Sequence, residues 1–341
     1  MKRFSGFEKG INLGGWLSQG TYDKEHLDTF INENDFKTIA DWGVDHVRVP
    51  IDYNIIETDE GEVIESGYDY IQTAIDMCKK YKLNMILDLH KTAGFSFHAG
   101  YNESGFFESE ALQERFYSLW ERLAQRYGKY SDRVAFELLN EVTDRELSDT
   151  WNRISTTVIK KIRAYAPDTK IVLGGYWNNS IDALPDLALP YDENVVYTFH
   201  CYDPFLFTHQ AAYWLEKMPD DLHISYPGDI FEYRRIMKEI GMDYIQTYLD
   251  VPDSGFDSAY FERHFEKAVK LCEERGVALY CGEYGVINMA TPEDTLKWYE
   301  DINSAFKKLG IGRAAWSYKG VDYGLSDEHM KSVRDKVTNL L

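Results

Sequence analysis

The chain has 341 residues, of which 44% are hydrophobic and 28% are charged, a composition typical of a folded globular protein. Its formal net charge of −20 disfavours nucleic acids and anionic membrane surfaces as partners, because both carry negative charge themselves. There is no apolar run of about 18 residues or more, so no transmembrane helix is expected. We therefore expect a globular protein that acts on an uncharged substrate. We also expect it to be a monomer.

The cysteines and the N-terminus give expectations about redox state and location. The four cysteines show neither CxxC spacing nor a Cys/His cluster, so we expect no zinc site and favour buried free thiols, with a disulfide left open; they are Cys78, Cys201, Cys272 and Cys281. The opening residues, MKRFSGFEKGINLGG, lack the apolar segment of a signal peptide. The chain is therefore expected to be either cytoplasmic or secreted with its signal already removed.

Short apolar runs alternate with amphipathic helical stretches along the whole chain. The expected strands are Gly10–Leu13, His46–Val49, Asn84–Leu89, Val134–Leu139, Lys170–Gly174, Asn194–Phe199, Val277–Cys281 and Arg313–Trp316. The expected helical segments are Asn34–Trp42, Tyr68–Tyr81, Glu110–Tyr127, Asp149–Tyr165, a short one after Asn179, Tyr260–Glu274, Thr291–Leu309 and the closing segment Asp327–Leu340. Eight such units predict parallel pairing and a single α/β domain over residues 1–341, a (β/α)8 TIM barrel.

Two other architectures fit the sequence less well. An open doubly wound sheet would need a glycine-rich phosphate loop after a strand. Residues 10–15, GINLGG, do not match GxGxxG, and Trp16 follows where a helix should begin. A metal-dependent barrel hydrolase would need HxH after the first strand, and Asn12–Gly14 does not supply it.

The alternation breaks once, after the sixth strand. Residues 204–258 form a segment of about 55 residues, and a loop of that length is usually functional and carries its own structure. Apolar residues in Tyr233–Tyr248 have helical spacing, so a small helical insertion above one rim of the barrel is expected. It is rich in aromatic residues, namely Phe205, Phe207, Tyr213, Trp214 and Tyr226.

Polar side chains stand where the expected strands end. The fourth strand lies in VAFELLNEV, residues 134–142, and exits on an amide and a carboxylate. Alone, such a pair is more often a plain polar strand exit, and each of the other residues also has a structural reading as a core or packing residue. A barrel, however, gathers its strand ends onto one face. The residues brought together in this way are Arg48, His90, Asn140, Glu141, His200, Tyr202, Glu283 and Trp316.

Two carboxylates facing one pocket, with neither metal spacing nor a phosphate loop, fit glycoside hydrolysis. One carboxyl group must be protonated to donate to the leaving oxygen, and the other must stay ionised to attack the anomeric carbon. Arg48 and Tyr202 can stabilise a charged Glu283. Asn140 suits a hydrogen bond to the sugar 2-OH, and Trp316 can form the floor under the reacting sugar. The 8 Trp and 25 Tyr suit sugar binding too, because their rings pack on pyranose faces.

These residues resemble glycoside hydrolase family 5, a family of retaining (β/α)8 enzymes. The motifs that carry the resemblance are INLGGW at 11–16, HVRVP at 46–50, LDLH at 87–90, FELLNE at 136–141, FHCYDP at 199–204, CGEYG at 281–285 and AAWSYK at 314–319. Within the family the chain is similar to the small clostridial endoglucanase C type. That type has a helical insertion opening with Phe-Thr-His-Gln, which matches residues 207–210, and Trp214 follows shortly after.

The resemblance implies that Glu141 is the acid/base and Glu283 the nucleophile, with no cofactor and no metal. All eight positions of the family pattern match. Lys91 departs from the usual second His or small residue, which leaves the preference of a distal subsite open. Glu137, four residues before Glu141, is interpreted as a structural partner of Arg48, and Asp88 as a similar partner of His90.

We expect a retaining endo-β-glucanase acting on β-1,4-linked or mixed β-1,3/1,4-linked glucan by double displacement. Within the hydrolases, a β-mannanase remains open, as does an exo-acting β-glucosidase if the insertion closes the cleft. A carbohydrate-binding protein or scaffold on an inactive barrel is the alternative from another class. The intact pair Glu141 and Glu283 argues against that alternative.

Overall fold

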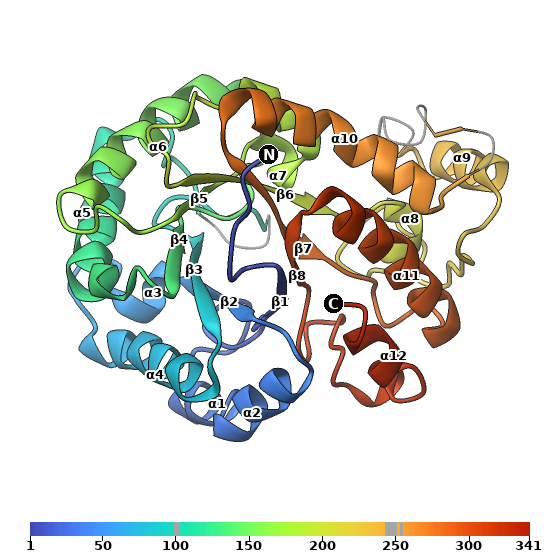
Figure 1. The fold of residues 1–341 in the computed structure, drawn as a ribbon, viewed down its shortest axis with the longest axis horizontal. Coiled ribbons are helices and arrows are strands. Elements are labelled where there is room, and N and C mark those ends of the chain that lie inside the picture. The colour runs from blue at the N-terminus through green and yellow to red at the C-terminus, as the bar shows by residue number, and fades with distance from the viewer. Residues whose placement is uncertain (99–102, 243–250, 253–254) are drawn as a thin grey trace.

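Eight parallel strands close into a barrel in sequence order, which confirms the predicted (β/α)8 fold (Figure 1). The protein is described by a computed structural model that covers residues 1–98, 103–242, 251–252 and 255–341. The strands are β1 Lys9–Asn12, β2 His46–Asp52, β3 Asn84–Lys91, β4 Val134–Glu137, β5 Ile171–Leu173, β6 Val195–Cys201, β7 Ala278–Tyr284 and β8 Gly312–Ala315.

Helices surround the barrel in the outer ring of Figure 1. The α-helices of the described residues are α1 Lys24–Thr29, α2 Glu33–Asp41, α3 Tyr53–Ile56, α4 Glu65–Tyr81, α5 Glu110–Tyr127, α6 Ser148–Arg163, α7 Tyr176–Asn179, α8 Phe205–Thr208, α9 Ile230–Glu239, α10 Ser258–Arg275, α11 Pro292–Leu309 and α12 Arg334–Thr338. The long ones carry sequence signals at their ends. Thr291 caps α11 and Pro292 opens it, while Gly276 and Gly310 end α10 and α11 in the left-handed conformation. None of the described helices is both long and apolar enough to cross a membrane.

The barrel interior changes from apolar to charged along the strands. Alternate residues of a strand face the same side, so β3 presents Ile86, then Asp88, then His90. Ile86 belongs to an apolar cluster that Phe4 and Phe7 join from the N-terminal segment. Asp88 lies above it in a fully buried charged layer. The polar layer therefore sits directly beneath the rim where the strands end.

Three tryptophans of the helical ring hold the loops that follow three strands. Trp120 of α5 donates its indole N–H to the Leu138 carbonyl at 3.0 Å, just after β4. Trp151 of α6 donates to a carbonyl just after β5 at 2.9 Å, and Trp298 of α11 to one just after β6 at 2.7 Å. All three rings are fully buried. A buried indole requires a partner, so packing of the ring helices fixes the backbone at the rim.

The segment after β6 contains helices, as the sequence predicts, but its second helix is displaced. α9 begins at Ile230, because Asp229 caps it, and it ends at Glu239 before the left-handed Gly241. The expected helix was Tyr233–Tyr248, and residues 243–250 lie outside the described residues. The cysteines are all free and buried, as expected.

Candidate active site

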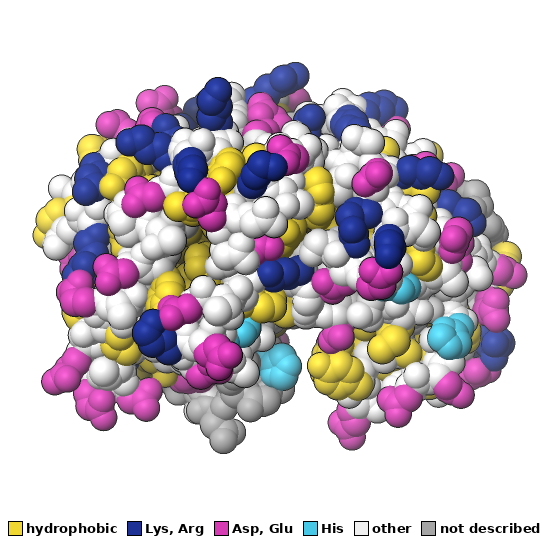
Figure 2. Space-filling model, turned by 90° about the horizontal axis from the view of Figure 1, so that it is seen from below, with side chains coloured by type: hydrophobic (Ala, Val, Ile, Leu, Met, Phe, Trp, Pro, Cys, Tyr) yellow, Lys and Arg dark blue, Asp and Glu magenta, His cyan; other side chains and the backbone are white. Residues whose placement is uncertain are grey.

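A cleft of about 490 Å³ opens at the carboxyl ends of the strands. The molecule is hollowed there, in the notch with histidine side chains beside it at the lower edge of Figure 2. Six of the nine predicted site residues line this cleft, namely His90, Glu141, Tyr202, Trp214, Glu283 and Trp316. The other three, Arg48, Asn140 and His200, are buried and hydrogen-bond to members of that set or to one another. The residues predicted from the strand ends therefore lie together in one connected group in and beneath the cleft.

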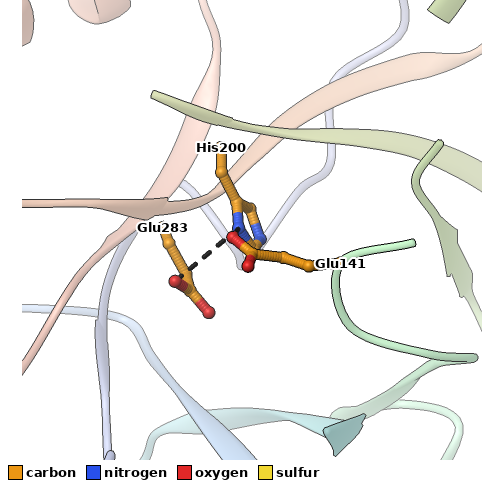
Figure 3. A group of neighbouring side chains, drawn as sticks. All are labelled: Glu141, His200 and Glu283. Atoms are coloured by element: carbon orange, nitrogen blue, oxygen red, sulfur yellow. Dashed lines mark hydrogen bonds and ion pairs between the residues drawn. The ribbon is translucent and has the colours of Figure 1, made fainter. Parts of the chain in front are cut away.

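The two carboxylates face each other across His200 (Figure 3). His200 Nδ1 lies 2.7 Å from Glu141 Oε1 and 3.6 Å from Glu283 Oε2. A carboxylate oxygen of Glu141 and one of Glu283 lie within 4.8 Å of each other. Burial lowers the pKa of His200 to about 4, so its ring is neutral at neutral pH. His200 therefore carries no positive charge at neutral pH that could compensate either carboxylate.

Glu283 receives hydrogen bonds on both of its oxygens. Arg48 Nη1 donates to Oε1 at 2.7 Å, and the Tyr202 hydroxyl donates to Oε2 at 2.8 Å. Hydrogen bonds to a carboxylate, one of them from a permanent cation, favour its charged form. Glu283 is therefore held on both oxygens, with the positive charge of Arg48 directly against it.

Arg48 lies lower in the barrel than its predicted position at a strand end. It is the third residue of β2, which continues for four residues beyond it. It binds Glu137 through two contacts of 2.7 and 3.0 Å, which confirms the predicted partnership. Burial acts to lower the pKa of Arg48, but Asp88, Glu137 and Glu283 outweigh it and raise that pKa well above its usual range. Arg48 is a permanent buried cation beneath the site.

Glu141 stands in the loop beyond β4, and its surroundings contrast with those of Glu283. Burial raises its pKa above the ordinary glutamate value, although hydrogen bonding from Asn178 acts in the opposite direction. The Asn178 amide donates to Glu141 Oε2 at 2.9 Å. Asn178 was not predicted, because its contact depends on a backbone conformation that the sequence run GGYWNNS does not signal. A raised pKa suits Glu141 to hold a proton and act as the acid.

His90 and Trp316 form an aromatic side of the site. Their rings are stacked with centroids 5.8 Å apart and planes 3° apart. Asp88 Oδ2 lies 2.6 Å from His90 Nδ1, which confirms the predicted pairing, and burial lowers the pKa of His90. A Cβ at Gly14 would lie 2.8 Å from the Trp316 ring, so the glycine of the INLGGW motif leaves room for that ring.

Trp214 belongs to the wall that the segment after β6 contributes. Its side chain is 36% exposed and its ring lies 6.5 Å from that of Tyr323, which also lines the cleft. Lys91, by contrast, is buried and is absent from the described lining. Its ammonium lies 3.9 Å from Asp52 Oδ2 and over the ring of Tyr53. The structure therefore gives Lys91 a supporting position at the end of β3.

Glu141, His200 and Glu283 are also the one group among the described residues with spacing that could hold a metal ion. In the observed arrangement the facing atoms of Glu141 and His200 are occupied by a hydrogen bond to each other. A divalent ion would have to displace the proton of that bond. The expectation of a metal-free site stays a prediction.

Comparisons with known proteins place the chain in a family. The family described as cellulase (glycosyl hydrolase family 5) matches residues 8–322. Cellodextrinase A of Ruminococcus flavefaciens is 49% identical over 92% of this chain and 86% of its own length. Endoglucanase C of Acetivibrio thermocellus is 39% identical over 98% of both chains.

Among solved structures, the endoglucanase Cel5A of Thermotoga maritima superposes with a TM-score of 0.76 at 24% identity, covering 98% of this chain and 97% of its own. At that identity the likeness concerns the fold. The family match over most of the chain, together with the two relatives, decides the assignment. The chain belongs to glycosyl hydrolase family 5, near the endoglucanase C type, and is a glycoside hydrolase.

Proposed function

We propose that the protein is a retaining endo-β-glucanase that cleaves β-1,4-glucosidic bonds of cellulose-type or mixed-linkage β-1,3/1,4-glucans. The glucanase activity is supported by the family and the relatives, and one observation carries the retaining mechanism: oxygens of Glu141 and Glu283 lie within 4.8 Å of each other. Retaining glycosidases hold their carboxyl groups roughly 5–5.5 Å apart, whereas inverting ones need roughly 6.5–9.5 Å to admit a water. The short separation supports direct attack by a carboxylate on the sugar.

The two carboxyl groups take different roles in this reaction. Glu141, whose pKa burial raises, protonates the glycosidic oxygen while Glu283 attacks the anomeric carbon and forms a glycosyl-enzyme. Glu141 then removes a proton from water, which attacks the same carbon and releases Glu283. Two displacements at one carbon restore the original anomeric configuration.

The remaining site residues position the sugar between these carboxyl groups. Trp316 offers its ring as a floor and His90 stacks beside it. Asn140 is held by Arg48, whose Nη2 donates to its Oδ1 at 2.9 Å, and its amide nitrogen is assigned to the sugar 2-OH. Trp214 extends the aromatic surface along one wall.

The stereochemical course of hydrolysis tests the mechanism. We expect proton NMR of an aryl β-cellobioside digest to show the β-anomer of cellobiose first, with the α-anomer growing in later by mutarotation. Immediate appearance of the α-anomer would contradict the retaining assignment, because it requires a single displacement. Absence of turnover on every β-glucoside would refute the β-glucanase proposal itself.

A second candidate is a preference for short cellodextrins with attack near a chain end. The 49% identity to a protein named cellodextrinase A favours it. An endo-acting enzyme is expected to release a ladder of oligosaccharides from barley β-glucan and to lower the viscosity of carboxymethylcellulose early. Release of glucose or cellobiose alone, with viscosity preserved, would favour the exo-acting alternative. Products from mannan instead would identify a mannanase.

A further inference from the structure

The turn that follows β5 has an unusual backbone. Trp177, Asn178 and Asn179 have φ angles of +49°, +57° and +56°, a conformation uncommon outside glycine and tolerated best by asparagine and aspartate. Two backbone hydrogen bonds of 3.0 Å fasten this turn to the loop after β4, from Trp177 to Thr143 and from Asn178 to Val142. The turn is therefore attached to the loop that carries the acid/base.

Both asparagines of the turn act on Glu141. Asn178 Nδ2 donates to Glu141 Oε2 at 2.9 Å. Asn179 Nδ2 lies 3.3 Å from His200 Nε2, and an amide N–H can only donate, so this orientation of the amide assigns the ring proton to Nδ1. His200 Nδ1 lies 2.7 Å from Glu141 Oε1 and donates that proton to it. Each oxygen of Glu141 thus has its own donor.

We propose that the turn 177–179 is a positioning device for Glu141, in which Asn178 holds Oε2 directly and Asn179 holds Oε1 through His200. Neither donor can accept a proton from the carboxyl group, because the amide nitrogen and the protonated Nδ1 have no free lone pair. The acid proton of Glu141 is therefore directed into the cleft, toward the glycosidic oxygen. This inference rests on the proposed role of Glu141 as acid/base.

The hydrogen bond from Asn178 to Glu141 also predicts the direction in which the pH profile of activity shifts when Asn178 is replaced. A hydrogen bond donated to a carboxylate favours its ionised form, so removing Asn178 raises the pKa of Glu141. Formation of the glycosyl-enzyme requires protonated Glu141. The alkaline limb of the pH profile of kcat/KM therefore moves to higher pH when the pKa of Glu141 rises. Other elements place these titratable and charged groups around Glu141: Arg48, Asp88, His90, His200, Tyr202, Glu283 and Tyr323. None of them is altered by the substitution.

The variant Asn178→Gly tests the proposal, because glycine keeps the left-handed backbone and removes only the side chain. On a β-cellobioside with a poor leaving group, kcat/KM is expected to fall about five- to tenfold, the value of one net hydrogen bond. The alkaline limb of the pH profile of kcat/KM should move to higher pH. On 2,4-dinitrophenyl β-cellobioside, kcat/KM should stay at the wild-type value, because that leaving group departs without protonation.

Asn178→Asp provides a second, matched variant that also tolerates the left-handed region. Its carboxylate would face Glu141, so the alkaline limb should move further upward than in the glycine variant. Lys82→Gly is the control for placing glycine at a positive φ, since Lys82 is an exposed left-handed residue that ends α4, before β3 begins; its kinetics should match wild type.

An unchanged pH profile in Asn178→Asp, or equal losses on both leaving groups in Asn178→Gly, would overturn the positioning role while leaving the hydrolase proposal intact. A wild-type enzyme without turnover on either cellobioside would instead refute the proposed function. If the glycine variant does not fold, the pH profile of Asn178→Asp decides.

Discussion

Replacing Glu283 by glutamine is expected to lower kcat on an aryl β-cellobioside by roughly 10⁴–10⁶-fold, the range seen when a residue of a covalent-catalysis unit is removed. Glutamine keeps the size of the side chain but cannot form the glycosyl-enzyme bond as a carboxylate does. Arg48 and Tyr202 would then donate to a neutral group. Steady-state kinetics measure the loss, and thermal unfolding shows whether the variant keeps its fold.

Azide distinguishes the roles of the two carboxyl groups. In Glu283→Ala, azide can occupy the space of the lost carboxylate and attack directly, so turnover should return with an inverted, α-configured glycosyl azide. In Glu141→Ala, azide should intercept the glycosyl-enzyme and give the β-azide. The opposite pattern would exchange the two assignments, and full activity in either alanine variant would contradict the proposed pair.

Tyr202→Phe is the graded control for this experiment. It removes one hydrogen bond of 2.8 Å from Glu283 and leaves the carboxylate in place. A hydrogen bond to a charged group contributes about 1.5–3 kcal/mol, so kcat should fall roughly ten- to a hundredfold, far less than in Glu283→Gln. A glutamine variant that loses no more than the phenylalanine variant would show that Glu283 is not the nucleophile.

The barrel and its rim were predictable, because strand alternation and strand-end chemistry both follow from local sequence. His90, His200 and Glu283 stand near the ends of β3, β6 and β7, where the expected strands ended. The supporting role of Glu137 could be distinguished from the acid/base role of Glu141 because Glu137 stands deeper in the barrel. Once parallel strands are assumed, the position of a residue along its strand determines its layer.

The errors in strand length have physical reasons. The expected second strand ends at Val49, just before Pro50, and proline lacks a ladder donor. β2 nevertheless continues through Pro50 to Asp52, with Pro50 in register with Asp88, which places Arg48 deeper than predicted. Conversely, Leu138 and Leu139 read as strand yet lie beyond β4. There the Leu138 carbonyl accepts a hydrogen bond from the indole of Trp120. This is a tertiary contact, and the local sequence cannot predict it.

Asn178 illustrates what sequence patterning could not supply. Its role depends on three consecutive left-handed residues, and asparagine in a polar loop signals a turn without giving its handedness. Arg48, His90, His200 and Glu283, by contrast, stand on strands and point inward by strand alternation, while the other predicted site residues follow directly after a strand or lie in the segment after β6. Asn178 reaches Glu141 only because a turn after β5 is fastened to the loop after β4.

Arg48→Met is expected to destabilise the protein by about 3–5 kcal/mol, the cost of breaking a buried ion pair by removing one partner. Arg48 is fully buried and lies 2.7–3.0 Å from three carboxylates, those of Asp88, Glu137 and Glu283. Without the cation, these groups remain buried and uncompensated. Urea-induced unfolding measures the difference. Arg126→Met, which breaks an exposed pair with Glu65, is the control and should cost about 0–1 kcal/mol.

The destabilisation in Arg48→Met should also grow with pH. Burial already raises the pKa of Asp88 to about 7 in the presence of Arg48, and it raises the pKa of Glu137 as well. A carboxyl group with a raised pKa in the folded state binds more protons folded than unfolded. Stability is then highest below its unfolded pKa, near 4, and is lost as pH rises through the folded value. Losing the cation raises the folded pKa values further, so the gap to wild type should be wider at about pH 7 than at about pH 5. An equal loss at both pH values, or a loss no larger than that of Arg126→Met, would contradict the view that Arg48 compensates buried carboxylates beneath the site.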